Sequence, residues 1–110
     1  MSILSNAATV TIANGATVSN AIDLAEMVVV AIQTPSALTS TTFTLQGSSD
    51  NSTFAAITNF DGTDYTITVA ASKYIVLALY ELVGVRYLKV VAGSAEAAER
   101  NIILMVRSMK

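Results

Sequence analysis

The chain of 110 residues contains no cysteine, no histidine and no tryptophan. Without cysteine the protein forms no disulfide bonds and no thiolate metal sites. Without histidine it lacks the commonest general base and the commonest metal ligand. A hydrolytic enzyme would have to rely on the eight carboxylates, and their order along the chain shows no acid/base pairing pattern. We therefore expect that the protein is not an enzyme and that it needs no cofactor.

Charged side chains are also scarce. They make up 13% of the residues, against about 25% in typical domains. The net charge is −2, and the six basic residues stand singly, so no basic run exists to neutralise nucleic-acid phosphates. Such a chain covers its surface with uncharged Ser, Thr, Asn and Gln, or buries part of that surface against partners. We expect both, and we expect no nucleic acid as partner.

Long apolar runs are absent as well. The run at 27–32 is far shorter than the roughly 20 residues that span a bilayer. Residues 1–5 lack both the basic flank and the apolar stretch of a signal peptide. The sequence therefore predicts a soluble protein that is made in the cytoplasm and has no membrane contact.

Alternation of polar and apolar residues dominates the rest of the chain, as in Thr9-Val10-Thr11-Ile12, and this period of two indicates half-buried strands. Turn signals such as Asn14-Gly15 and Asp61-Gly62 separate the alternating segments. We expect about eight short antiparallel strands in a β-sandwich with a jelly-roll-like architecture. The expected strands cover residues 9–12, 27–32, 42–46, 53–60, 65–69, 74–79, 86–91 and 102–106.

The chain length fits one domain. We expect a single β-sandwich over residues 9–110, preceded by a flexible, polar N-terminal arm of residues 1–8. Residues 77–83 and 95–100 contain helix-forming side chains but are too short for stable helices. The first is interpreted as a strand that runs into a one-turn crossover at Gly84. The second is interpreted as a long exposed loop before the last strand.

The apolar runs at 27–32 and 75–79 would promote aggregation on an exposed sheet edge. They are therefore expected to be central strands or to be buried in an oligomer. Interface candidates are Ile3 and Leu4 in the arm, Tyr80 directly after the second run, and Arg86, whose charge is expected to reach solvent or a partner.

Oxygen-bearing side chains in two loops make Asp50, Asp61 and Asp64 candidate calcium ligands, although no metal site is expected. The spacing matches no EF-hand, and Asp also favours turns, so turn formation is the simpler explanation. The four tyrosines could stack on sugars. They lie in or beside strands, however, and packing in the core or an interface is the favoured interpretation.

Three sequence segments, taken in their order along residues 8–108, resemble segments of small structural proteins of tailed bacteriophages. They are the strand and Ser/Asp loop at 45–54, the segment Gly84-Val85-Arg86-Tyr87-Leu88-Lys89-Val90, and the Ala-rich loop of residues 93–100 with its final strand. The resemblance implies a β-sandwich that decorates or cements a capsid. The segment around Arg86 is also similar to the closing strands of discoidin-like sugar-binding sandwiches, although this chain lacks their tryptophans.

The leading hypothesis is therefore a capsid decoration or cement protein located in the virion, which binds copies of itself, as a homo-oligomer such as a trimer, and a major capsid protein. The alternatives are a carbohydrate-binding module displayed on a virion, and a tail or baseplate component with the same fold.

Overall fold

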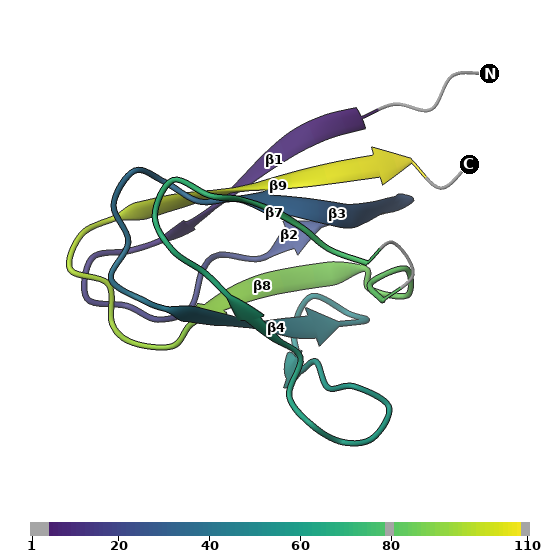
Figure 1. Ribbon diagram of the computed structural model, residues 1–110. Helices are drawn as coiled ribbons and strands as arrows, with labels where there is room; N and C mark the ends of the chain where they lie inside the picture. Colours follow the sequence, from purple (N-terminus) through teal and green to yellow (C-terminus); the bar gives the residue numbers. More distant parts are fainter. Residues whose placement is uncertain (1–4, 79–80, 109–110) are drawn as a thin grey trace.

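The computed structural model describes residues 5–78 and 81–108, and it shows an all-β sandwich of two antiparallel sheets (Figure 1). The described residues form no helix, and thus none that is long and apolar enough to cross a membrane. The predicted fold class is confirmed. The strands are β1 (Ser5–Ile12), β2 (Ile22–Asp23), β3 (Met27–Gln33), β4 (Thr42–Ser48), β5 (Ala55–Ala56), β6 (Thr66–Thr68), β7 (Tyr74–Val76), β8 (Tyr87–Ala92) and β9 (Arg100–Ser108).

The first sheet has the order β1-β9-β3-β7 and the second has the order β2-β8-β4-β5, with β6 also paired to β4. The two sheets form the upper and lower layers of Figure 1. Neighbouring strands are often far apart in the sequence: β1 pairs along its whole length with β9, and Val10 lies opposite Ile102. The first and last strands thus lie side by side in one sheet.

The core lies between the sheets and follows the alternation of the longer strands. On β9, Ile102, Leu104 and Val106 are buried, while the residues between them are only partly buried. Phe43 and Leu45 on β4 are buried in the same core cluster. Because successive side chains of a strand point to opposite faces, this pattern requires each of these strands to present one face to the opposite sheet.

Strand β3 departs from simple alternation. Its register with β9 shifts between Val29 and Ala31, and Val28 and Val29 are both buried in the core cluster. A bulge of this kind adds one residue to a strand and redirects its side chains. Because β3 lies between β9 and β7, the run at 27–32 is internal in its sheet, as the sequence predicts.

Part of the expected N-terminal arm belongs to the first sheet. Residues 5–8 belong to β1, and Ser5 lies opposite Arg107. The pairing extends this far because β9 is a nine-residue strand whose outer edge would otherwise stay unpaired. Ile3 and Leu4 lie outside the described residues.

The loop between β8 and β9 is not wholly exposed, contrary to the sequence interpretation. The side chain of Glu96 is buried, with 1% of the residue exposed. Its carboxylate accepts hydrogen bonds from the backbone N–H groups of Thr39 (2.8 Å) and Ser40 (2.9 Å) and from the Ser40 hydroxyl. The Nε of Arg100 donates another at 2.9 Å and forms a salt bridge with it. These bonds compensate the charge for the loss of its water.

The backbone of Glu96 joins a third loop to the same point. Gly15 donates its N–H to the Glu96 carbonyl at 2.7 Å, and the Glu96 N–H donates to the Ala16 carbonyl at 3.1 Å. Residues 93–99 therefore follow a path set by two other loops, although their composition favours a helix. These three loops gather at the left end of the sandwich in Figure 1.

Burial alone would raise the pKa of the Glu96 carboxyl. The hydrogen bonds from Ser40, Thr39 and Arg100 outweigh that effect and lower the pKa from 4.5 to about 2. A carboxyl whose pKa is lower in the folded chain stabilises the fold above its unfolded pKa, and this contribution is lost as the pH falls. The difference corresponds to about 3 kcal/mol, lost between about pH 4.5 and pH 2.

We expect Glu96→Gln to lower the free energy of unfolding by about 3 kcal/mol at pH 7, because Arg100 loses its buried partner. The variant should also lose less stability than the wild type when the pH falls from 5 to 2. Urea unfolding at several pH values measures both effects. Glu99→Gln is the matched control, because Glu99 is exposed in the same loop and should change stability little. An unchanged acid dependence in Glu96→Gln would contradict the role of this carboxylate.

Candidate interaction surface

On one side of the sandwich, β7 forms the edge of the first sheet and β6 lies at the edge of the second. Among the described strands, β6 pairs only with β4, and β7 pairs only with β3. The chain passes from β6 in one sheet to β7 in the other through residues 69–73. Two three-residue edge strands thus border the opening between the sheets. We call this part of the molecule the β6/β7 side.

Strand β7 exposes apolar side chains on this side. Tyr74 is 57% exposed and Val76 is 79% exposed, whereas Leu77, just beyond the strand, is buried. The apolar run at 75–79 thus begins in an edge strand, so the expectation of a central strand is wrong for its first residues. Burial of the run in an oligomer stays a prediction. Residue 79 lies outside the described residues.

The backbone N–H and C=O groups of Tyr74 and Val76 point away from the sheet. Leu77 donates its N–H to the Val30 carbonyl, and Thr34 donates to the Lys73 carbonyl, both at 2.9 Å. In an antiparallel pair, successive residues direct their N–H and C=O groups to alternate sides. Residues 73, 75 and 77 therefore face β3, and Tyr74 and Val76 present their N–H and C=O groups at the free edge of the sheet.

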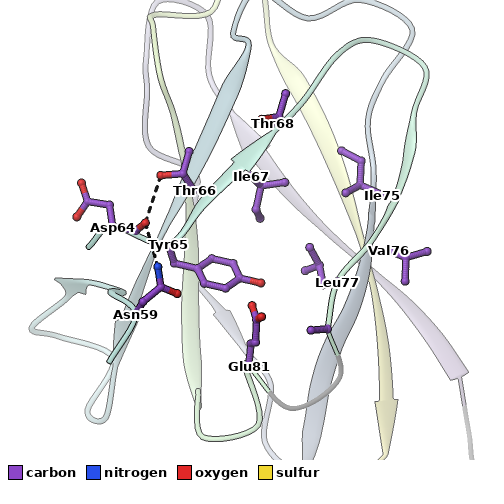
Figure 2. A pocket seen from close by; sticks show the side chains of 11 residues that line it. Asn59, Asp64, Tyr65, Thr66, Ile67, Thr68, Ile75, Val76, Leu77 and Glu81 are labelled. Carbon is purple, nitrogen blue, oxygen red and sulfur yellow. Dashed lines mark hydrogen bonds between the residues drawn. The ribbon is translucent and has the colours of Figure 1, made fainter. Parts of the chain in front are cut away.

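A groove of about 390 Å³ runs between β6 and β7. Ile67, Ile75 and Leu77 line it with apolar surface, and Asn59, Tyr65 and Glu81 lie at one end, as Figure 2 shows. The Val76 side chain points away from the groove. The groove thus combines an apolar wall with a few polar groups, as binding sites for small molecules do.

Tyr65 and Glu81 point toward one another in Figure 2. Burial of the Tyr65 ring raises the pKa of its phenol, and a hydrogen bond to the Glu81 carboxylate raises it further. The hydroxyl can donate this bond only while it is protonated. The pair joins the segment before β6 to the turn after β7, and both residues also line a second hollow.

The second hollow has a volume of about 410 Å³ and shares Asn59, Tyr65 and Glu81 with the first. Phe60 lies on its rim with its side chain fully exposed. An aromatic side chain in this position adds no packing energy to the single chain, and its apolar face is available to a ligand or a partner.

The three calcium candidates do not form one cluster. No group of three or more acidic side chains able to hold a metal ion occurs in residues 5–78 and 81–108. Asp50 accepts hydrogen bonds from the backbone N–H groups of Ser52 and Thr53 (both 2.9 Å), and Asp61 accepts from the N–H of Thr63 at 3.0 Å. The carboxylates of Asp50 and Asp61 therefore each stabilise the turn in which they lie. These hydrogen bonds also lower the pKa of both carboxyl groups. The backbone of Asp64 bridges to Thr58.

Arg86 is bound within the chain. Its Nε and Nη2 donate to the two carboxylate oxygens of Asp23 at 2.7 Å and 3.3 Å, and its guanidinium lies 5.0 Å from the centre of the Tyr87 ring. About half of each side chain of the ion pair is exposed. Asp23 lies opposite Tyr87 in the β2–β8 pair, which brings the two charges together. Arg86 therefore reaches solvent with its charge already paired. Tyr80, the other candidate in this half of the chain, lies outside the described residues.

Two residues of the β6/β7 side were not singled out from the sequence. Phe60 stands between Asn59 and Asp61-Gly62, so the turn residues around it could have indicated exposure. No local signal marks Glu81, because its partner Tyr65 lies in a different segment of the chain.

No known family model matches the chain, and no curated protein matches its sequence. The geometry therefore carries the functional interpretation. The groups of the β6/β7 side are an apolar edge with free backbone donors and acceptors, and a groove whose phenol and carboxylate bind one another. This set suits non-covalent binding.

We expect the Tyr65 phenol to ionise at higher pH than a free tyrosine, because burial and the Glu81 carboxylate both favour its neutral form. A spectrophotometric titration should show a late component that disappears in Tyr65→Phe. In Glu81→Gln the component should move toward lower pH. A late component that persists in Tyr65→Phe does not come from Tyr65, and one that does not move in Glu81→Gln would contradict the contact with the Glu81 carboxylate.

Proposed function

We propose that the protein is a non-catalytic structural component of a virion, of the capsid decoration or cement type, which acts by packing against copies of itself and a capsid shell. The observation that carries the proposal is the unpaired apolar edge of β7. The exposed side chains and free backbone groups of Tyr74 and Val76 are suited to contact with another chain.

Protected edge strands normally carry a charged residue, a proline or a covering loop. Strand β7 has the sequence Tyr-Ile-Val and carries none of these within its bounds. In a single copy this edge is a liability, and in an assembly it is covered. The low charge content points in the same direction, because charged residues are depleted in the cores of interfaces.

The proposal of a virion protein is supported by the resemblance of three sequence segments of the chain to structural proteins of tailed bacteriophages. A decoration or cement protein needs many weak contacts repeated by symmetry and no catalytic group, which agrees with a chain free of histidine and cysteine. On this proposal the protein assembles in the host cytoplasm and remains in the virion, with the major capsid protein as its second partner.

The purified chain should be larger than a monomer in sedimentation experiments, or should bind capsids of its phage saturably. Electron microscopy of the particles should then show its density on the head. Density on the tail or baseplate would assign the same fold to that structure. A chain that stays monomeric at high concentration and does not bind the particles would contradict the proposal.

A second candidate function is carbohydrate binding at the two hollows around Tyr65. The observation that favours it is the exposed Phe60 next to Asn59 and Glu81, since an aromatic face and planar polar groups together suit the apolar and hydroxyl surfaces of a sugar.

If this second function holds, a glycan array should give hits that Phe60→Ala abolishes. Phe54→Ala serves as the control, because Phe54 lies under the Lys89 ammonium, 4.3 Å from its ring centre, and does not line either hollow. An array without hits for the wild type removes this candidate and leaves the structural role intact.

A further inference from the structure

We propose that β7 pairs with β7 of a second copy about a two-fold axis, antiparallel and with Tyr74 opposite Val76 of the partner. The inference rests on the proposed structural function and names the first contact of the assembly. It would join the two four-stranded sheets of the copies into one continuous sheet.

The backbone groups favour this register. Tyr74 and Val76 present their N–H and C=O groups at the free edge, as the bonds of Lys73 and Leu77 to neighbouring segments require. In an antiparallel pair, residues with outward groups must lie opposite each other to exchange hydrogen bonds in both directions. With Tyr74 opposite the partner's Val76, both residues of each copy are satisfied.

The side chains also complement one another in this arrangement. Tyr74 and Val76 are both exposed on the face opposite Ile75. Across the two-fold axis each tyrosine ring lies against a valine of the partner, and aromatic with β-branched pairs stabilise neighbouring strands. The two most exposed apolar groups of the edge therefore cover each other.

The charges around β7 select the antiparallel direction. Lys73 precedes the strand and Glu81 follows it, and the structure gives Lys73 no ion-pair partner among residues 5–78 and 81–108. An antiparallel pair brings the start of one β7 to the end of the other, so each Lys73 approaches the end that carries Glu81 of the partner. A parallel pair would place the two lysines together, which like charges oppose.

The other edge of the same sheet is a poorer partner. At β1, the Thr11 N–H donates to Asn20 Oδ1 at 2.7 Å, and the Thr11 carbonyl accepts from the Asn20 N–H at 3.3 Å. This part of the β1 edge is already paired within the chain. Pairing of β7 with β1 would also be heterologous and open-ended, whereas pairing of β7 with itself closes as a dimer.

Engineered cysteines test the register directly, because the natural chain has none. Tyr74→Cys and Val76→Cys, mixed as two differently tagged proteins, should form a disulfide between the two variants under mild oxidation. Their Cα atoms would lie about 5.5 Å apart, within the disulfide range. Each variant alone should crosslink at least tenfold more slowly, since like positions would be roughly 8–9 Å apart. Equal crosslinking of Val76→Cys with itself would overturn the register.

A charge variant tests the contact independently of cysteine chemistry. Val76→Lys should raise the dissociation constant of the dimer at least tenfold in sedimentation velocity, and its circular dichroism should match the wild type because the side chain is exposed. Ala13→Lys makes the same charge change at an exposed position in the loop after β1 and should leave the dimer intact. A Val76→Lys chain that associates like the wild type overturns the β7 contact but leaves the structural function standing. A wild-type chain that neither associates nor binds capsids overturns both.

Discussion

The buried carboxylate of Glu96 is the interaction on which one end of the sandwich depends. The buried carboxylate accepts hydrogen bonds from the backbone of residues 39 and 40, the hydroxyl of Ser40 and the guanidinium of Arg100. The backbone of Glu96 forms hydrogen bonds with residues 15 and 16. The loops that connect β1 to β2, β3 to β4 and β8 to β9 therefore meet at one ionic centre. Removal of any donor leaves a charge in a place that water does not reach, so the arrangement stabilises only as a complete set.

The β6/β7 side has the opposite character. There the sheets end in three-residue strands, and the segment between β6 and β7 crosses from one sheet to the other without closing the gap. The groove between β6 and β7, the exposed side chains of Tyr74 and Val76, and the outward backbone groups of β7 lie open at this side. At the Glu96 end the buried carboxylate binds groups of the same chain, whereas the β6/β7 side leaves backbone and side-chain groups of an edge strand exposed. This asymmetry agrees with the proposed role, because one end of the fold is held together internally and an edge strand at the β6/β7 side stays available.

Much of the fold could be predicted from local patterns. The alternation at 9–12, 42–46, 86–91 and 102–106 has a period of two that only a strand satisfies, and the observed β1, β4, β8 and β9 include or overlap these segments. The positive φ of Gly15 and Gly62 lies in the turns that the sequence marks. The surface of the candidate site was less predictable. Tyr74 and Val76 belong to an apolar run that looks the same in a central strand and in an edge strand, and only the order of strands in the sheet distinguishes the two.

By itself, the sequence determined that the chain forms strands, where most of them lie, and that the commonest catalytic and metal-binding side chains are missing, because these properties depend on residue type and on neighbours within a few positions. Tertiary structure alone decided that Glu96 is buried and Arg86 is paired. It also decided that β7 lies at an edge and that Tyr65 meets Glu81. Each of these depends on segments that are distant in the chain, and the pairing of such segments is set by the packing of the whole core and not by local preference.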